Sequence, residues 1–423
     1  MKHYQSRDIH SVNRKSKKVL VINDLDPRES RGAASMALSL TERTFDKDEI
    51  IFLCTSKKAF KLKKSVFATF YSIPENSIDY LEDKVRNRFP NFEGFLRIFA
   101  FRRLWRILRI ILRHSPRIIW VHQIGWRIPI TSLLIFRLLK IPVVLTIHDF
   151  SFLRFRKIYI EDFAGEKELV ESKLKAFHEN SSQLTLQFRD KPNIWQWITR
   201  IIIANNSEII YLSDLQSEIY TLNGYPKGHV IPNSVRKCKC GVELKPKRNK
   251  VAALEVLFAG RLIGKGLERL AFSILENECA HLHIAGGNEL RAVVQNILPE
   301  HKFTYHGMLS EAEIFELLHS IDITVVGSFC FDVLPTIALE SLAHGTPFIS
   351  TPTTGVYNLS LLLGTPFTLS LEGNIDFDEI CQSVRKFDAH RSFDYLSQLV
   401  TSNDSVEKYQ EIFRLKLENC SMK

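Results

Sequence analysis

The stretch SFCFDVLPTIALESLAHGTPFISTPTTG, residues 328–355, decides the fold that this chain can adopt. It predicts a loop, a helix, a turn and a short strand, and the β-branched run at 322–326 before it predicts a buried parallel strand. Pro335 suits the first turn of the helix, where its missing N–H would have no partner, and Gly345 with Pro347 ends that helix. This order of elements is one unit of a doubly wound α/β sheet.

Two acidic residues stand eight positions apart in this stretch. Asp332 lies in the loop before the predicted helix, and Glu340 lies within the helix. Both can face one cavity at the carboxyl end of the preceding strand, which is where open α/β sheets bind their ligands. The alternative is an ordinary amphipathic helix with a solvated Glu340.

The stretch resembles the donor-sugar motif of family-4 retaining glycosyltransferases (glycosyl transferases group 1). Its VLP after Asp332 resembles the NLP variant of some polysaccharide-assembly members. That motif is an acid, seven residues, a second acid, a helix of small residues and a G-T-P turn, as in Asp332, Glu340 and SLAHGTP here. The resemblance implies that Glu340 holds the ribose of a nucleotide-sugar and that Asp332 meets hydroxyls of the transferred sugar. Backbone N–H groups near Thr336 and Ile337 would hold the diphosphate. Asp332 departs from the family, which usually has Glu there.

The resemblance also implies an α/β GT-B fold, with two Rossmann-like doubly wound parallel-sheet domains facing each other across a cleft. We expect a flexible basic arm at 1–17, an acceptor domain at 18–234, a linker at 235–250, a nucleotide-sugar donor domain at 251–403, and a C-terminal helix at 404–423 that crosses back to the first domain. The linker is placed where the chain is basic, poor in apolar residues and unfavourable to helices.

Composition is consistent with two full domains. The chain has 423 residues, of which 45% are hydrophobic, and a net charge of +10. The charge suits phosphate-bearing ligands or an anionic membrane, and nothing beyond charge favours nucleic acid. Seven scattered cysteines contain no C-x-x-C pair, which is typical of reduced thiols in a cytosolic protein. The polar, basic N-terminus predicts no signal peptide, and no apolar run is long enough to span a bilayer.

A glycine-rich turn opens the predicted second domain in LEVLFAGRLIGKGLERLAF, residues 254–272. Arg261 and Lys265 stand in this turn after Gly260. Two cations stabilise the negative charge that a nucleoside diphosphate gains as it leaves. The resemblance gives them this role, although the spacing is one residue shorter than in the family.

Four other glycines follow predicted strands or precede helices. Gly286 with Gly287, in HLHIAGGNEL, is expected near the donor, and Gly307 is expected near the nucleotide base. Gly32 stands where the family has a diphosphate turn in the first domain, and the alternative is a plain helix-start residue.

Two predicted strands of the first domain end in histidine. RIIWVHQ (117–123) carries His122, and KIPVVLTIHDF (140–150) ends near His148 and Asp149. The resemblance places His122 close to the transferred sugar, and His148 with Asp149 are acceptor-side candidates. The alternative for each histidine is a structural one with satisfied hydrogen bonds.

The stretch FLRIFAFRRLWRILRIILRHSPR (95–117) predicts an amphipathic helix. Its apolar face would hold Phe101, Leu104, Trp105, Leu108, Ile111 and Leu112, and its basic face Arg102, Arg103, Arg106, Arg109 and Arg113. Such a helix either lies on anionic lipid or packs into an α/β core with an arginine-rich solvent side, and the two are compatible.

Together these features predict a cytoplasmic enzyme, either soluble or peripheral on the inner face of the membrane, that moves a sugar from a nucleotide-sugar to a glycan or lipid-linked acceptor with retention of configuration. No cofactor and no metal are expected, since GT-B enzymes do not depend on a metal-bound diphosphate. The alternative is a non-catalytic sugar-nucleotide-binding or glycan-binding subunit of a surface-polysaccharide assembly. The sugar, the base and the acceptor are not determined by these motifs.

Overall fold

The structure is a computed structural model that describes residues 17–27, 33–56, 63–64, 68–74, 101–125, 127–154, 157–180, 183–233, 235, 253–363, 367–386 and 404–421. Gly32, almost all of the predicted arm at 1–17 and almost all of the predicted linker at 235–250 lie outside these residues.

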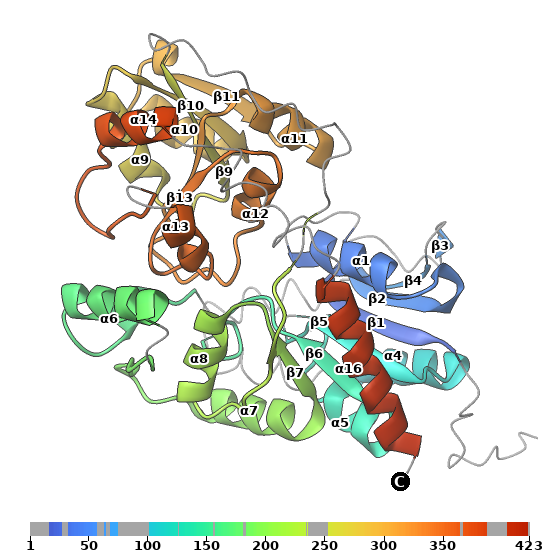
Figure 1. Cartoon of the computed structure of the whole chain (residues 1–423). Coiled ribbons are helices and arrows are strands. Elements are labelled where there is room, and N and C mark those ends of the chain that lie inside the picture. The colour runs from blue at the N-terminus through green and yellow to red at the C-terminus, as the bar shows by residue number, and fades with distance from the viewer. Residues whose placement is uncertain are drawn as a thin grey trace, which may run out of the picture.

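Two α/β domains, each built on its own sheet, make up the described chain (Figure 1). The first sheet has eight strands in the order β3-β4-β2-β1-β5-β6-β7-β8, all parallel except the β3–β4 pair. These strands are β1 (Val19–Leu25), β2 (Ile50–Ser56), β3 (Lys63–Lys64), β4 (Thr69–Pro74), β5 (Ile118–Gln123), β6 (Val143–Thr146), β7 (Glu208–Tyr211) and β8 (His229–Val230). The second sheet is wholly parallel, in the order β11-β10-β9-β12-β13. Its strands are β9 (Leu254–Gly260), β10 (Ala280–Gly286), β11 (Phe303–Gly307), β12 (Ile323–Val326) and β13 (Phe348–Ser350).

Helices alternate with the strands in both domains. The first domain contains α1 (Ala33–Thr44), α4 (Phe101–His114), α5 (Ser132–Leu138), α6 (Lys167–Asn180), α7 (Ile194–Asn206) and α8 (Asp214–Leu222). The second contains α9 (Leu267–Leu275), α10 (Asn288–Gln295), α11 (Glu311–Ser320), α12 (Thr336–Ala343), α13 (Tyr357–Leu363) and α14 (Phe377–Lys386). Short 3-10 turns are η1 (Lys47–Glu49), η2 (Ile160–Asp162) and η3 (Glu300–Lys302), and α16 (Asp404–Ser421) closes the chain. This arrangement confirms the predicted fold of two doubly wound domains.

The central strands are apolar because helices cover both of their faces. Val19 to Ile22 of β1 are completely buried, and Trp120 of β5 has no exposed surface. Local signals also hold: the side chain of Ser310 accepts a hydrogen bond from the N–H of Glu313, which forms the capping box that starts α11. The sequence pattern is therefore sufficient to place these elements.

The last helix, α16, packs on the first domain although the chain reaches it from the second (Figure 1). Tyr409 and Phe413 contact Trp120, with ring centroids 4.9 and 5.0 Å apart. The side chain of Gln410 donates to the carbonyl of Thr44 at the end of α1, at 3.2 Å. The C-terminal helix thus completes the core on one face of the first sheet.

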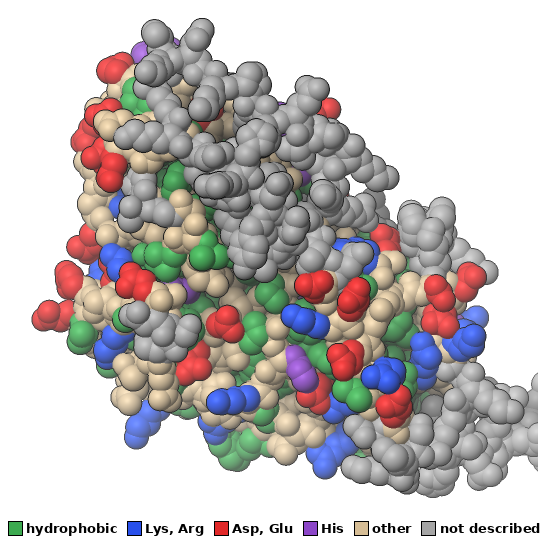
Figure 2. Space-filling view, viewed as in Figure 1, with side chains coloured by type: hydrophobic (Ala, Val, Ile, Leu, Met, Phe, Trp, Pro, Cys, Tyr) green, Lys and Arg blue, Asp and Glu red, His purple; other side chains and the backbone are tan. Residues whose placement is uncertain are grey.

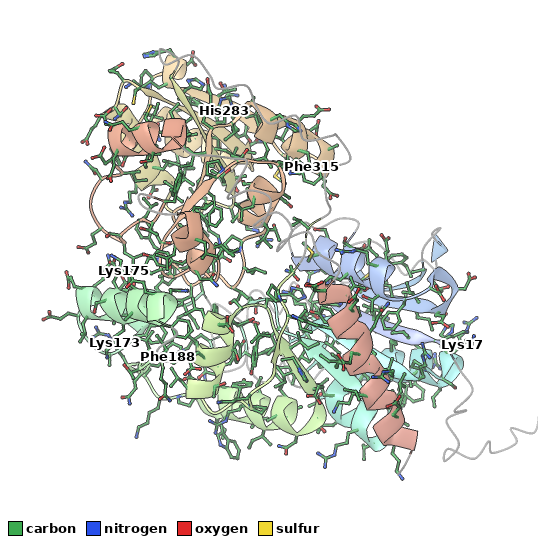
Figure 3. The ribbon with its side chains drawn as sticks, in the orientation of Figure 1. Lys17, Lys173, Lys175, Phe188, His283 and Phe315 are labelled. Atoms are coloured by element: carbon green, nitrogen blue, oxygen red, sulfur yellow. The ribbon has the colours of Figure 1, made fainter. Side chains whose placement is uncertain are left out.

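Helix α6 makes a second connection between the domains. Lys175, labelled in Figure 3, donates to the hydroxyl of Ser370 at 3.1 Å. Glu171 accepts from the N–H of Leu371 at 3.2 Å, and Lys167 forms an ion pair with Glu372 at 3.0 Å. The domains are therefore joined on the α6 side by side chains that reach one short segment of the second domain.

The arginine-rich helix is present as α4, but its buried stripe differs from the prediction. Ile107, Ile110 and Ile111 are buried, whereas Trp105 and Leu112 are 55% and 56% exposed. The predicted apolar face was wrong for Trp105 and Leu112, because the apolar positions of this helix cover more of its circumference than one packed side requires. The exposed side therefore mixes arginines with two large apolar residues.

The molecular surface in Figure 2 shows lysine and arginine interspersed with aspartate and glutamate over the first domain. The excess positive charge is not gathered into one patch on this visible face. Among the described residues, no helix is both long enough and apolar enough to cross a bilayer.

Candidate active site

A cavity of about 650 Å³ lies between the two domains. It is lined on the first-domain side by Asp24, Gln123, Arg127, His148, Asp149 and Lys157, and on the second-domain side by Gly260, Arg261, Lys265, Asp332, Thr336 and Ile337. The carboxyl ends of parallel strands from both sheets therefore face one hollow, which is the usual ligand position in such folds.

A second cavity, of about 1010 Å³, adjoins the first. The two share Gly260, Arg261, Thr336 and Ile337, so the start of α12 and the β9 turn stand at their junction. Glu340, one helical turn further along α12, lines only the second cavity. An elongated ligand lying across both would meet the helix N-terminus at its middle, where N–H groups favour negative charge.

The turn after β9 depends on two glycines that flank Lys265. Gly264 and Gly266 have φ angles of 73° and 77°, a region that favours glycine. A Cβ atom on Gly266 would stand 2.2 Å from the carbonyl oxygen of Gly327. The turn is thus pressed against the segment after β12, and this contact brings Lys265 beside Asp332 despite the short Arg–Lys spacing.

Lys265 and Asp332 form an ion pair between these two segments. Burial lowers the pKa of Lys265, but the Asp332 carboxylate more than offsets this, so the pKa is raised overall and the lysine stays charged. The backbone of Asp332 is fixed as well: its N–H donates to Thr353 at 3.0 Å, and its carbonyl accepts from Gly355 at 2.8 Å. Gly355 leaves room for this, since a Cβ there would stand 1.8 Å from the carbonyl oxygen of Val333.

A third cation, Lys157, comes from the irregular segment that follows β6. The N–H of Phe331 donates to the carbonyl of Ile158 at 2.8 Å, and Tyr159 bridges to Cys330. This pairing of the two domains carries Lys157 to the cavity that Lys265 also lines. Burial lowers the pKa of Lys157. The sequence does not predict a role for Lys157, because its segment has no periodicity and the contact that positions it is not local.

Glu340 is a partly buried acid in the second cavity. Burial, together with the nearby charge of Glu311, raises its pKa to about 7. The site also contains Gly286 and Gly287, and a Cβ on Gly286 would stand 2.3 Å from Leu290 and 2.5 Å from the carbonyl of Gly260. The glycines therefore let β9 and β10 approach closely beside this acid.

Only one of the two strand-end histidines, His148, lies at the cavity. His122 lies behind it in the core, which corrects the position beside the transferred sugar that was expected for His122. His148 lines the first cavity, whereas His122 is 1% exposed and does not line it. His122 Nδ1 lies 3.0 Å from His148 Nε2, and its ring packs on Trp120 at 4.2 Å. Residues 120 and 122 project from the same face of β5, so His122 follows Trp120 into the core. Burial lowers the pKa of both rings, that of His148 to about 4.

The remaining predicted residues differ in how close they lie to the cavities. Asp149 lines the first cavity, and its carboxylate accepts from the N–H of Ser151 at 2.9 Å. Gly307 has a φ angle of 71° and is followed by Met308, which lines the second cavity in its place. Asp24, at the end of β1, also lines the first cavity, and its carboxylate accepts from the N–H of Ile128 at 2.6 Å.

Comparison with known proteins agrees with this geometry. Residues 77–234 match the model described as "Glycosyl transferase 4-like domain", and residues 253–361 match "Glycosyl transferases group 1". Together the two models cover more than half of the chain. No curated protein matches it.

Solved structures with the same architecture span nearly the whole chain. Sucrose-phosphate synthase from Thermosynechococcus elongatus has a TM-score of 0.61 at 14% identity, covering 94% of this chain and 98% of its own. Anabaena HepE in complex with UDP-glucose has a TM-score of 0.60 at 12% identity, covering 94% and 99%. A trehalose-6-phosphate synthase has a TM-score of 0.55 at 13% identity, covering 95% and 99%. At such identities the likeness shows a shared fold.

Three observations indicate the same family: the motifs around Asp332 and Glu340, the two facing sheets and the two matched family models. The chain belongs to the group 1, family-4 glycosyltransferases and is a glycosyltransferase of the GT-B fold.

Proposed function

We propose that this enzyme transfers a sugar from a nucleoside diphosphate sugar, with retention of configuration and without a metal ion, to a glycan or lipid-linked acceptor. The observation that carries the proposal is that Arg261 and the start of α12 stand at the junction of the two cavities, and that Lys265 lines the first of them. A diphosphate there would face two cations and the N-terminus of a helix.

The donor would lie across both cavities. Its ribose would reach Glu340 in the second cavity, and its transferred sugar would meet Asp332 and His148 in the first. His122 would act as a positioning residue for His148, through the contact between their ring nitrogens. Uridine nucleotides are the first donors to test, because a structure of HepE, which shares the fold, contains UDP-glucose.

The cations support a reaction in which the leaving group itself accepts the proton. The bond between the anomeric carbon and the diphosphate oxygen breaks, and the electron pair stays on that oxygen. The same oxygen then takes the proton of the acceptor hydroxyl, which attacks on the face that the diphosphate leaves. Arg261, Lys265 and Lys157 would stabilise the developing charge, so no metal is required. Asp332, held in an ion pair with Lys265, is poorly placed to act as a nucleophile.

A lipid-linked acceptor would be met at the inner face of a membrane. The exposed side of α4 supports this part of the proposal, since Trp105 and Leu112 lie exposed with Arg109 and Arg113. Arg109 packs over the Trp105 ring, with 5.2 Å from its guanidinium carbon to the ring centroid. Apolar and cationic groups on one exposed surface suit an anionic lipid interface.

The direct test is sugar transfer or donor hydrolysis by the purified full chain with a panel of nucleotide-sugars. Arg261→Ala should lower kcat/KM by about 10²-fold or more, because it removes a cation from the leaving group. Lys227→Ala, at an exposed position outside both cavities, should leave kcat/KM unchanged. Retention would be checked by NMR of the product anomer.

Donor binding without hydrolysis or transfer would contradict the catalytic proposal and favour a binding subunit. Unchanged transfer by Arg261→Ala would contradict the role given to that residue.

A further inference from the structure

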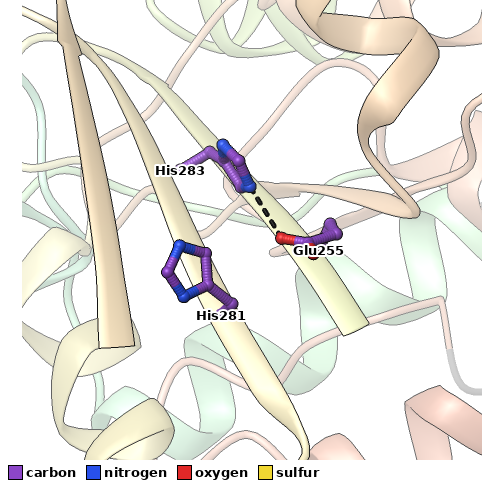
Figure 4. A group of neighbouring side chains, drawn as sticks. All are labelled: Glu255, His281 and His283. Atoms are coloured by element: carbon purple, nitrogen blue, oxygen red, sulfur yellow. Dashed lines mark hydrogen bonds and ion pairs between the residues drawn. The ribbon is translucent and has the colours of Figure 1, made fainter. Parts of the chain in front are cut away.

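A cluster of histidines lies on the second sheet, away from the cavities described above. Glu255 projects from β9, and His281 and His283 project from β10 (Figure 4). His283 is labelled on the second domain in Figure 3. None of the three residues lines either cavity.

Strand register brings these side chains together. His281 pairs directly with Glu255 across the parallel strands, and His283 stands two residues further along β10. Alternate residues of a strand project from the same face, so both imidazoles and the carboxylate lie on one side of the sheet. One ligand atom from each residue lies within 4.8 Å of the other two.

The contacts within the cluster already orient these groups. His283 Nε2 lies 2.7 Å from Glu255 Oε2, and its Nδ1 lies 2.9 Å from His306 Nε2 on β11. His281 Nε2 lies 2.9 Å from the hydroxyl of Thr304. The rings of His283 and His306 stack at 5.1 Å. A histidine held through its second nitrogen in this way is typical of a metal ligand, because the outer partner fixes its tautomer.

We propose that Glu255, His281 and His283 bind one divalent transition-metal ion, and that Zn²⁺ fits the site best. Two imidazoles and one carboxylate form a ligand set that zinc takes readily, with a fourth position left for water.

Binding of zinc would require only small movements of these side chains. Tetrahedral ligands at about 2.0–2.1 Å from zinc lie about 3.3 Å from one another. The His283–Glu255 contact of 2.7 Å would open by a few tenths of an ångström, and the His281 ring would move towards it.

The site would be structural and not part of sugar transfer. Glu255 lies five residues before Gly260 on β9, and His281 lies five residues before Gly286 on β10. That separation is about 17 Å along each strand from the glycines that line the second cavity. Bound zinc would hold β9 and β10 together at their amino ends. Zinc binding at this place is therefore compatible with sugar transfer that needs no metal.

The test uses the full chain without a histidine tag, treated with chelator and then titrated with Zn²⁺ alone. We expect saturable binding of one ion by calorimetry and a rise of several degrees in Tm that grows with the zinc concentration. Co²⁺ in place of zinc should give the visible absorption of a four-coordinate site with nitrogen and oxygen ligands.

His283→Gln and Glu255→Gln should each weaken Zn²⁺ binding by at least tenfold and remove the rise in Tm. The matched control is His229→Gln, because His229 pairs with Glu208 at 3.2 Å on the first domain and belongs to no group of three metal-binding side chains among the described residues. Circular dichroism of the zinc-free variants checks their fold. If His283→Gln does not fold, the test of zinc binding relies on Glu255→Gln. Zinc binding that is absent, or that both variants retain, would overturn the proposal.

Discussion

At Glu340, the charged form of the side chain favours binding of the ligand but lowers the stability of the folded protein. It is an acid on a helix whose neighbours are mostly apolar, and burial with the charge of Glu311 raises its pKa to about 7. A carboxylate would accept hydrogen bonds from two ribose hydroxyls, whereas its protonated form offers fewer acceptor sites. Burying the charged form without a ligand costs stability.

We expect the donor nucleotide to bind more tightly as the pH rises from 6 to 8, because Glu340 ionises over that range. Glu340→Gln should weaken binding and flatten this pH dependence. Isothermal titration with UDP or another nucleoside diphosphate that binds, at pH 6, 7 and 8, would measure both effects. A Glu340→Gln variant with the same pH profile as the wild type would contradict the proposed ribose contact.

The same substitution should stabilise the protein without ligand at high pH. The pKa of Glu340 is higher in the folded state than in the unfolded chain, so its favourable contribution is complete below about pH 4.5 and is lost as the pH rises through about 7. Glu340→Gln should therefore raise Tm relative to the wild type at pH 8, and by less at pH 5. An equal difference in Tm at both pH values would contradict the shifted pKa.

At the scale of elements, the β9–α9 turn and the segment after β12 act as one unit. Gly266 contacts the backbone of Gly327, Gly264 accepts hydrogen bonds through its carbonyl from Phe329 and Cys330, and Lys265 pairs with Asp332. These contacts explain how a turn shorter than the family pattern still brings its lysine to the cavity.

Gly266→Ala should therefore destabilise the second domain by more than Gly373→Ala. Both glycines have positive φ angles, 77° and 80°, but a Cβ at 373 meets nothing within 4 Å, whereas one at 266 meets a carbonyl oxygen at 2.2 Å. We expect a loss of about 1 kcal/mol at 373 from the backbone conformation alone, and about 2–4 kcal/mol at 266. Urea unfolding of the two variants would measure the difference, and equal losses would show that the contact with Gly327 relaxes freely.

Helix α4 gives the second prediction at this scale. Trp105→Ser combined with Leu112→Ser should reduce binding to vesicles rich in phosphatidylglycerol by several-fold, since the exposed apolar groups would enter the lipid interface. Ile263→Ser is the control, because Ile263 is 67% exposed but lies on the second domain. Flotation of the wild type and variants with anionic and neutral vesicles would measure binding. A wild type that floats with neither would contradict the membrane proposal.

At the scale of the whole molecule, the chain crosses between the domains more than once. Helix α16 returns to the first sheet, and α6 is bonded to residues 370–372 of the second domain. Because side chains of α16 pack into the core of the first domain, the stability of that domain depends on the last helix.

Tyr409→Ala tests that dependence. Tyr409 is completely buried against Trp120, and its hydroxyl lies 3.4 Å from that of Thr146. Removing the ring should cost about 3–5 kcal/mol of unfolding free energy, whereas Tyr409→Phe should cost about 1 kcal/mol. Chemical denaturation followed by tryptophan fluorescence would compare them. If the alanine variant lost no more than the phenylalanine variant, α16 would not be part of the core.

The sequence by itself determined the elements and the family, because both depend on local patterns. The buried run before Asp24, the capping box at Ser310 and the acid spacing of Asp332 and Glu340 can each be identified without tertiary contacts. Only the tertiary structure decided which side chains meet. It placed Lys157 beside Lys265 through a bridge between domains, put His148 in front of His122, and grouped Glu255 with two histidines through strand register. These contacts join residues far apart in the chain, and no local periodicity records them.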